Sequence, residues 1–323
     1  MTVPSHPKVS ILVPCYNVKE YVEQCLESLR TQTLRNIEIL MIDDGSTDGT
    51  SEILKQYTQL DPRFKLISKS NSGYGDSMNL GLANAKGEFI GIVESDDFVE
   101  PDMYKNLYDL AKKYDLDRCR CGYFGHREGK DESKITFSFV KKNEIINPVV
   151  TQSPFFTRPS IWANIYKREW LEANKINFLA TPGASYQDTS FNFKANACCR
   201  RFMMVEDCYV HYRLDNANNS TNSNKKIFCV CDEIGEIFDF IRERPDRRDL
   251  VKVANKLRTK TYNWNLRRIA PESRHIFIDR WHEESRLLHE NGELDFSLLK
   301  FKEKVREWLI LFYPQFFEKK FDV

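Results

Sequence analysis

Apolar runs and amphipathic stretches alternate along the first hundred residues of the chain. Four short runs rich in β-branched and other apolar residues predict strands at residues 9–13, 37–42, 64–67 and 89–93. Between the first two, apolar side chains recur at helical spacing: Tyr21, Val22, Cys25, Leu26 and Leu29. Asn17 and Glu20 have the spacing of a capping box, which predicts the start of this helix. Continuous apolar strands separated by helices predict an α/β fold with a mostly parallel sheet flanked by helices.

The alternation ends near residue 115, and two other patterns follow. Residues 118–215 are irregular and lead into an Asn- and Ser-rich tract at 215–220. Beyond about residue 225, charged stretches of helical periodicity cover 226–243, 248–268, 273–290 and 297–320, with breaks near Pro245, Pro271 and Gly292. We therefore predict an α/β domain over residues 1–220 and a helical C-terminal region over 221–323.

Charge and cysteine usage narrow the function classes. The 323 residues carry 48 Lys and Arg against 47 Asp and Glu, a net charge of +1, which argues against nucleic-acid binding through bulk positive charge. The first ten residues lack a basic segment followed by an apolar run, and no stretch approaches the length of a membrane span. The nine cysteines show no paired CxxC spacing. We expect buried, reduced thiols in a cytoplasmic protein.

Polar residues gather directly after three of the predicted strands. Tyr16-Asn17, Asp43-Asp44 and Asp96-Asp97 each follow an apolar run. In parallel sheets, ligands bind beyond the carboxyl ends of the strands. These three pairs are therefore expected to converge on one ligand site at one edge of the sheet.

The acidic residues at these strand ends have two interpretations. Clustered carboxylates such as Glu94, Asp96 and Asp97 repel one another unless a cation neutralises them, and oxygen ligands suit Mg²⁺ or Mn²⁺ holding a diphosphate. The alternative is an acidic turn that caps the helix beginning near residue 101. Asp44 similarly either belongs to a turn or accepts a hydrogen bond from an imide N–H such as that of uracil. Tyr16 offers an aromatic face to a base, a contact worth about 1–3 kcal/mol.

A dinucleotide-binding motif is a poor match. The GxGxxG fingerprint needs a third glycine where Met78 stands after Gly73-Tyr74-Gly75. This segment also follows the third strand, whereas the fingerprint follows the first. The sequence contains no GxxxxGK[ST] motif.

Taken together, the motifs resemble the family 2 glycosyltransferases of the GT-A fold over about residues 7–215. The resemblance is carried by 14–17 (PCYN), 43–48 (DDGSTD), 71–73 (NSG), Asn79, 87–90 (GEFI) and 95–97 (SDD). Enzymes of this family typically use a UDP-sugar with a divalent metal and invert the anomeric centre. The resemblance implies a catalytic domain at 1–220, with a nucleotide-binding part at 1–115 and an acceptor-binding part at 116–220.

The resemblance also assigns roles in donor binding. It places Asp44 against uracil, Asp96 near the ribose and Asp97 as the direct metal ligand. The family often has Asp at Glu94 and Arg at Met78, so a direct role for Glu94 is not implied. The remaining residues placed around the nucleotide are Pro14, Tyr16, Asn17 and Gly73.

The second half matches the family more weakly. Residues 186–191 resemble its Glu-Asp motif, which puts Asp188 in the position of the catalytic base and Gln187 in place of the usual Glu; the alternative is an Asp that caps a helix over 189–197. Residues 211–213 (HYR) resemble the segment that closes over the diphosphate. Arg213 suits phosphate, and His211 is either a metal ligand or a structural side chain. Trp162 lies either at the acceptor cleft or in the core.

These assignments predict transfer of a sugar from a UDP-sugar to a hydroxyl of a glycan, lipid-linked or glycoprotein acceptor, with Mn²⁺ or Mg²⁺ and with Asp188 as base. The alternative is a catalytically silent sugar-nucleotide-binding subunit of another transferase, which Gln187 and Glu94 would permit. The last helix, 297–320, combines a basic run with an apolar face (Leu299, Val305, Leu309 and Phe312). We expect it to pack on the catalytic domain or a second copy, with contact to the inner face of an anionic membrane as the alternative.

Overall fold

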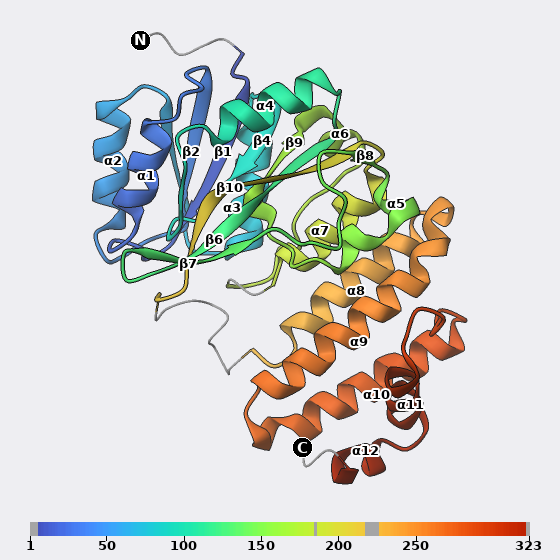
Figure 1. Ribbon diagram of the computed structural model, residues 1–323. Helices are drawn as coiled ribbons and strands as arrows, with labels where there is room; N and C mark the ends of the chain where they lie inside the picture. Colours follow the sequence, from blue (N-terminus) through green and yellow to red (C-terminus); the bar gives the residue numbers. More distant parts are fainter. Residues whose placement is uncertain (1–5, 184–185, 217–225, 321–323) are drawn as a thin grey trace. The chain divides into compact units, whose positions relative to one another are not determined.

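The computed structural model describes residues 6–183, 186–216 and 226–320 of the chain (Figure 1). It divides into two compact units near residue 218. The first unit contains all the strands of the described chain, and the second is helical. The α/β class and the helical C-terminal region predicted from the sequence are thus confirmed.

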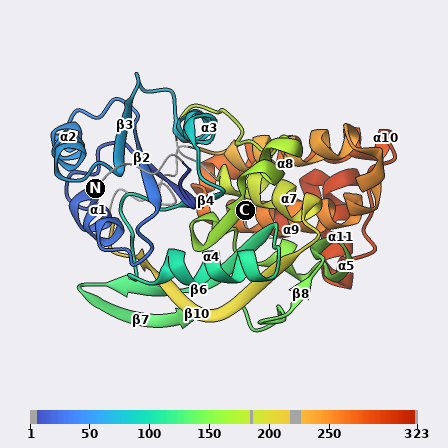
Figure 2. The same cartoon turned by 90° about the horizontal axis from the view of Figure 1, so that it is seen from above.

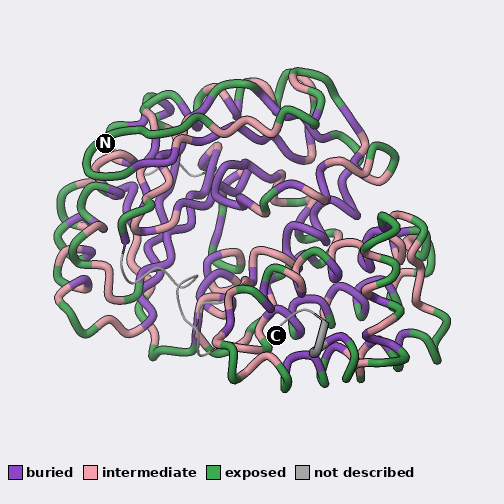
Figure 3. Tube along the Cα trace, turned by 60° about the horizontal axis from the view of Figure 1, so that its bottom comes forward, coloured by how far each residue is buried: buried purple, intermediate pink, exposed green. Residues whose placement is uncertain are grey.

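The four predicted strands form the parallel half of one sheet. They are β1 (Val9–Cys15), β2 (Ile37–Asp43), β3 (Phe64–Ser68) and β4 (Phe89–Ile92), in the order β3-β2-β1-β4. The connecting helices are α1 (Val22–Arg30), α2 (Thr50–Leu60) and α3 (Tyr74–Asn84). β1 and β2 are buried along their whole length, and the buried part of the trace follows the central strands (Figure 3). The carboxyl ends of β1, β2 and β4 therefore meet at one edge.

The irregular middle region extends the same sheet. It contributes β5 (Phe98–Val99), β6 (Arg118–Arg127), β7 (Lys130–Ile135), β8 (Ile145–Ile146), β9 (Asn164–Lys167) and β10 (Phe202–Arg213). β9 runs antiparallel between β4 and β6, β10 lies parallel to β6, and β5 and β8 pair antiparallel with β10. The helices here are α4 (Met103–Lys113), α5 (Pro148–Thr151), α6 (Arg168–Ala173) and α7 (Asp188–Cys198). Figure 2 shows α3 and α4 on opposite faces of the sheet.

The predicted capping box before α1 is wrong. The helix begins at Val22, and Tyr21 at its N-cap makes no side-chain capping bond. Asn17 lies in the left-handed region with φ 52°, and its Oδ1 accepts a hydrogen bond from Thr47 N at 2.8 Å. Ser46 Oγ accepts from Asn17 N at 3.1 Å. Asn17 thus joins the loops that follow β1 and β2, a contact that local spacing could not reveal.

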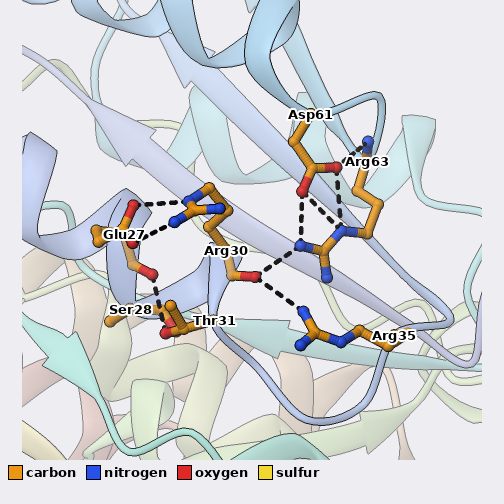
Figure 4. Close-up of polar contacts among 7 residues, drawn as sticks. All are labelled: Glu27, Ser28, Arg30, Thr31, Arg35, Asp61 and Arg63. Carbon is orange, nitrogen blue, oxygen red and sulfur yellow. Dashed lines mark hydrogen bonds and ion pairs between the residues drawn. The ribbon is translucent and has the colours of Figure 1, made fainter. Parts of the chain in front are cut away.

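The C-terminal end of α1 is fixed by basic side chains (Figure 4). Arg63 and Arg35 donate to the carbonyl oxygen of Arg30 at 2.7 and 3.3 Å. Asp61 holds the Arg63 guanidinium at 2.6 Å. Positive side chains near the C-terminal end of a helix are stabilising, because this end of the helix dipole is negative. Through Arg63, these contacts also connect α1 to the loop before β3.

The helical unit contains α8 (Cys229–Arg242), α9 (Val251–Arg268), α10 (Arg274–Glu290), α11 (Phe301–Phe312) and α12 (Pro314–Lys320). The predicted fourth helix is therefore two helices, interrupted before Pro314, whose ring cannot continue a helix. Buried Glu307 joins α9, α10 and α11. It accepts hydrogen bonds from Arg258 Nη2 at 2.8 Å, Thr259 Oγ1 at 2.5 Å and Trp281 Nε1 at 3.3 Å.

The packing face predicted for the last helix is partly wrong. Ile310 and Leu311 of α11 are buried, whereas Val305 and Phe312 are exposed beside Trp308. No helix among the described residues is long and apolar enough to cross a membrane.

Candidate active site

The ends of β1 and β2 form one wall of the candidate site. Pro14 lies within buried β1 and is paired with Ile42 of β2, whereas Tyr16 just beyond the strand is 50% exposed. Asp43 Oδ1 accepts from Ser46 N at 3.0 Å, which holds the turn after β2. Tyr16 therefore presents its ring at the sheet edge while Asn17 and Asp43 shape the loops around it.

Asp44 organises the loop that follows β3. Its Oδ1 accepts from Ser72 N and its Oδ2 from Gly73 N, both at 2.9 Å, and the Lys69 ammonium is ion-paired with the carboxylate. Asp44 is buried. Because each carboxylate oxygen has two lone pairs, a nucleobase N–H would share Asp44 with these chain donors. Its role toward uracil stays a prediction.

Gly73, which was predicted to bind the donor, and the nearby Gly75 allow two chain segments to approach closely. Gly73 has φ +104°, and a Cβ there would lie 2.7 Å from Gly183 N. A Cβ on Gly75 would lie 2.0 Å from the carbonyl oxygen of Leu179. Asn79 adds a reciprocal pair of 2.9 Å hydrogen bonds with the backbone of Phe178. α3 is thereby docked against the segment that leads to Asp188.

Substituting Gly75 with alanine is expected to destabilise the first unit by about 1–3 kcal/mol, because the methyl group meets fixed backbone. Urea unfolding would measure the change. Gly235→Ala is the matched control: Gly235 lies in α8, and no atom of the described residues outside that helix comes within 4 Å of an added Cβ. That variant should be stabilised by about 0.5–1 kcal/mol. Equal effects at the two positions would contradict the close approach at Gly75.

The acidic cluster lies just beyond β4. Asp97 is 1% exposed, and its Oδ1 accepts from Arg213 N at 2.8 Å. Its buried Oδ2 has no hydrogen-bond partner among the residues that the structure describes. Burial, with the charge of Asp96 added, raises the pKa of Asp97 well above its usual value. An unsatisfied buried carboxylate oxygen is a suitable ligand for Mg²⁺ or Mn²⁺, so Asp97 fits the role of metal ligand.

Glu94 shares this environment. Burial raises the pKa of Glu94 to about 8, and the charges of Asp96 and Asp188 act in the same direction. Tyr74 donates its hydroxyl hydrogen to Glu94 Oε1 at 2.7 Å, which opposes the increase. Glu94 thus already has a hydrogen-bond donor within the chain, whereas Asp97 Oδ2 has none among the described residues.

Arg213 is placed beside the acidic cluster by several contacts. Its Nε donates to the carbonyl oxygen of Asp96 at 2.9 Å, its Nη2 donates to Gln24 Oε1 at 2.5 Å, and its guanidinium lies 4.9 Å from the ring centre of Tyr21. Asn216 Nδ2 donates to Asp96 Oδ2 at 2.7 Å. The structure therefore brings Asp96, Asp97 and Arg213 together at one end of β10.

His211 has different partners. Its Nδ1 lies 2.9 Å from Asp131 Oδ1 and its Nε2 lies 2.9 Å from Glu100 Oε1. Its ring stacks on Phe98 with centroids 4.3 Å apart. Both ring nitrogens thus face carboxylates outside the Glu94–Asp97 cluster.

Asp188 is the first residue of α7 and lies partly buried near the acidic cluster. Burial raises the pKa of Asp188 to about 6, while the positive charge of Arg158 opposes the increase. The neighbouring Gln187 is buried, and its Nε2 donates to Thr181 Oγ1 at 2.9 Å and to Gly183 O at 3.2 Å. Gln187 therefore positions the loop beside Gly73.

An aromatic stack supports Arg158. The guanidinium lies 4.5 Å from the ring centre of Tyr212, which in turn stacks on Trp162 with centroids 5.2 Å apart. Trp162 is 6% exposed and also meets Tyr123 edge-to-face. Trp162 is thus a buried support of the stack under Arg158.

Three side chains of the site were not identified from the sequence. Lys69, Tyr74 and Arg158 contact or influence Asp44, Glu94 and Asp188, respectively. Each comes from a loop or helix start without a recognisable local motif. Only the cluster of glycines around Tyr74 signalled that its segment approaches another part of the chain.

Comparison with known proteins identifies the family. The model of the family "Glycosyl transferase family 2" matches residues 10–193, more than half of the chain. The chain belongs to glycosyl transferase family 2. EpsH of Bacillus subtilis (strain 168), named as a glycosyltransferase, is 35% identical over 228 residues, covering 69% of this chain and 65% of EpsH. The chain thus matches just under two thirds of the length of that relative.

Solved structures of other proteins share the fold. S. aureus TarS 1–349, determined in complex with UDP-GlcNAc, has a TM-score of 0.58 at 19% identity, with 84% of this chain and 86% of that one covered. The mannosyltransferase PcManGT from Pyrobaculum calidifontis, in complex with GDP-Man and Mn²⁺, has a TM-score of 0.52 at 14% identity, covering 98% and 88%. At these identities the likeness shows the GT-A fold, as the sequence motifs predicted.

Proposed function

We propose that this family 2 glycosyltransferase transfers a sugar from a UDP-sugar to an acceptor hydroxyl with inversion at the anomeric carbon. The observation that carries the proposal is that the site holds two carboxylates in different states. The Oδ2 of buried Asp97 is unsatisfied among the described residues, and the pKa of Asp188 is raised to about 6. One carboxylate is suited to a cation that holds a diphosphate, and the other to accepting a proton near neutral pH.

The donor would lie across the ends of β1, β2 and β4. The exposed ring of Tyr16 suits stacking on uracil, and buried Asp44 directly follows β2 at the same edge. Pro14, Asn17 and Gly73 shape the surrounding loops, and Asp96 is the carboxylate proposed for the ribose. The TarS complex with UDP-GlcNAc supports a UDP-sugar as donor.

The diphosphate would lie between Asp97 and Arg213. A divalent Mn²⁺ or Mg²⁺ bound to Asp97 would supply positive charge that stabilises the departing diphosphate. The guanidinium of Arg213, already oriented by Asp96 and Gln24, can donate to phosphate oxygens through its planar fork. Preorganised charge of this kind is often the largest contribution to catalysis.

Asp188 acts as the general base in this proposal. It accepts the proton of the acceptor hydroxyl while that oxygen forms a bond to the anomeric carbon. The bond from the same carbon to the UDP oxygen breaks on the opposite face, and its electron pair leaves with UDP. Inversion follows from this single displacement. Gln187 contributes by holding the loop at 181–183.

The pH dependence of turnover tests this assignment. Because a protonated Asp188 cannot accept a proton, kcat/KM should fall as the pH decreases through about 6. Replacing Arg158 with methionine removes the positive charge that favours the ionised Asp188 carboxylate. The fall in kcat/KM on the acid side, the acid limb of the profile, should therefore occur about one pH unit higher. Arg286→Met, at an exposed pair with Glu290 on α10, is the control and should leave the limb in place. An unshifted limb in Arg158→Met would contradict the role of Asp188.

The activity itself is tested by a screen of UDP-sugars. Purified full-length protein would be incubated with each donor, with and without Mn²⁺, and UDP release measured. We expect one donor to release UDP in a metal-dependent manner. Metal-dependent binding of a UDP-sugar without release, across all donors and candidate acceptors, would instead favour the catalytically silent subunit.

The acceptor and its surroundings stay predictions. A glycan, a lipid-linked sugar or a glycoprotein would each supply the required hydroxyl. Contact with the inner face of a membrane, or with a second copy, would involve the exposed side of α11, where Val305, Trp308 and Phe312 lie.

A further inference from the structure

Two histidines and an aspartate that are not hydrogen-bonded to the carboxylates proposed for the donor converge on one another. His126 on β6 and Asp131 on β7 are directly opposite each other in the antiparallel pair, and His211 comes from β10 on the other side of β6. These three strands lie side by side (Figure 2). Nδ1 of both histidines lies 2.9 Å from the same oxygen, Oδ1 of Asp131.

From this convergence, we propose that His126, Asp131 and His211 form a second metal site, which takes a zinc-like divalent ion. Their three ligand atoms all lie within 4.8 Å of one another. Zinc binds imidazole nitrogen and carboxylate oxygen at roughly 2.0–2.2 Å, so tetrahedral ligand atoms lie about 3.3 Å apart. Widening the two 2.9 Å contacts by a few tenths of an ångström would open the position, and water would complete the coordination.

Glu100 supports this interpretation. Its Oε1 lies 2.9 Å from Nε2 of His211, the ring nitrogen opposite the one that faces Asp131. Metal-bound histidines commonly donate their second ring N–H to a carboxylate, which fixes the tautomer. A divalent ion beside Nδ1 would leave the opposite Nε2–H directed at Glu100, and its charge would balance those of Asp131 and Glu100.

The rings are also held in position before any ion binds. His126 and His211 are both buried, and Phe98 stacks on His211 while it meets His126 edge-to-face at 4.9 Å. Phe124 packs on His211 at 5.1 Å. Asp131, by contrast, is exposed, which leaves a path for an ion. An ion here would link β6, β7 and β10, and β10 carries Arg213.

This site can be tested separately from the proposed donor site. The full-length Asp97→Asn protein, which lacks the ligand proposed for the donor metal, would be stripped with chelator and titrated with Co²⁺, followed by Zn²⁺ competition. We expect one equivalent of cobalt with the strong visible bands of a four-coordinate site, displaced by zinc. We also expect zinc to raise the melting temperature.

Variants then assign the ligands. Asp131 is exposed, so folding should tolerate Asp131→Asn. Added to Asp97→Asn, this substitution should weaken metal affinity by at least about 100-fold. Glu100→Gln, added in the same way, should weaken it by about tenfold. His275 is an exposed histidine on α10, and His275→Gln should leave the metal affinity unchanged. Unaltered affinity in the Asp131→Asn protein, or only the weak spectrum of six-coordinate cobalt, would show that the three side chains form a hydrogen-bonded cluster and would overturn the proposal.

Discussion

Replacing Asp188 with asparagine is expected to lower the rate of transfer by about 10²- to 10⁴-fold, the usual contribution of a positioned general base. Asparagine keeps the size of the side chain but cannot accept the acceptor's proton near pH 7. The affinity for UDP should be nearly unchanged, because the nucleotide is proposed to bind at the ends of β1, β2 and β4. Initial rates of UDP release and calorimetric titration with UDP measure the two quantities.

Asp102→Asn is a matched control for this variant. Asp102 stands at the start of α4, as Asp188 does at α7, but it is exposed, and its Oδ1 accepts a hydrogen bond from Thr33 Oγ1 at 2.7 Å. The Asp102→Asn protein should transfer the sugar at the same rate as the unmodified protein. Full turnover in the Asp188→Asn protein would remove Asp188 from the mechanism and leave it as an acidic residue in the first turn of α7.

Asp97→Asn should abolish the effect of metal on donor binding and lower transfer by about 10³-fold or more. The substitution keeps the shape of the side chain but removes the anionic oxygen, Oδ2, that is buried and unsatisfied among the described residues. Asn Oδ1 can still accept the 2.8 Å hydrogen bond from Arg213 N. The loop should therefore stay folded, and the loss should arise from the missing ligand.

Calorimetric titrations of UDP with and without Mn²⁺ measure this effect. In the unmodified protein Mn²⁺ should strengthen binding, and in Asp97→Asn it should have no influence. Asp109→Asn, on the exposed side of α4, is the control and should retain the metal dependence. A metal effect that persists in Asp97→Asn would assign the ion to another carboxylate of the cluster.

Much of the nucleotide half could be predicted because its signals are local. Short, β-branched apolar runs such as 9–13 and 37–42 are typical of buried strands in a covered sheet, and parallel connections place their carboxyl ends together. Asp97 and Asp188 are candidates because their motifs follow a strand or start a helix, and their roles stay predictions. The same logic failed at Asn17, whose partner Thr47 comes from the next loop.

The second half depends on contacts between distant segments. β9 enters between β4 and β6 in the antiparallel direction, a pairing that leaves no periodic pattern in four residues. His211 has its partners at positions 100 and 131, so its surroundings could not be inferred from its neighbours in sequence. Arg158 likewise influences Asp188 across 30 positions, through the electrostatic field at the site.

The stereochemistry of the released sugar tests the central claim most directly, once the screen has identified the donor. The protein would be mixed with an α-linked UDP-sugar and the anomeric proton of the product followed by NMR before the sugar mutarotates. A single displacement assisted by Asp188 predicts the β anomer as the first product, from the unmodified protein and not from Asp188→Asn. The α anomer as the first product would contradict direct displacement, and with it the assignment of Asp188 as the base.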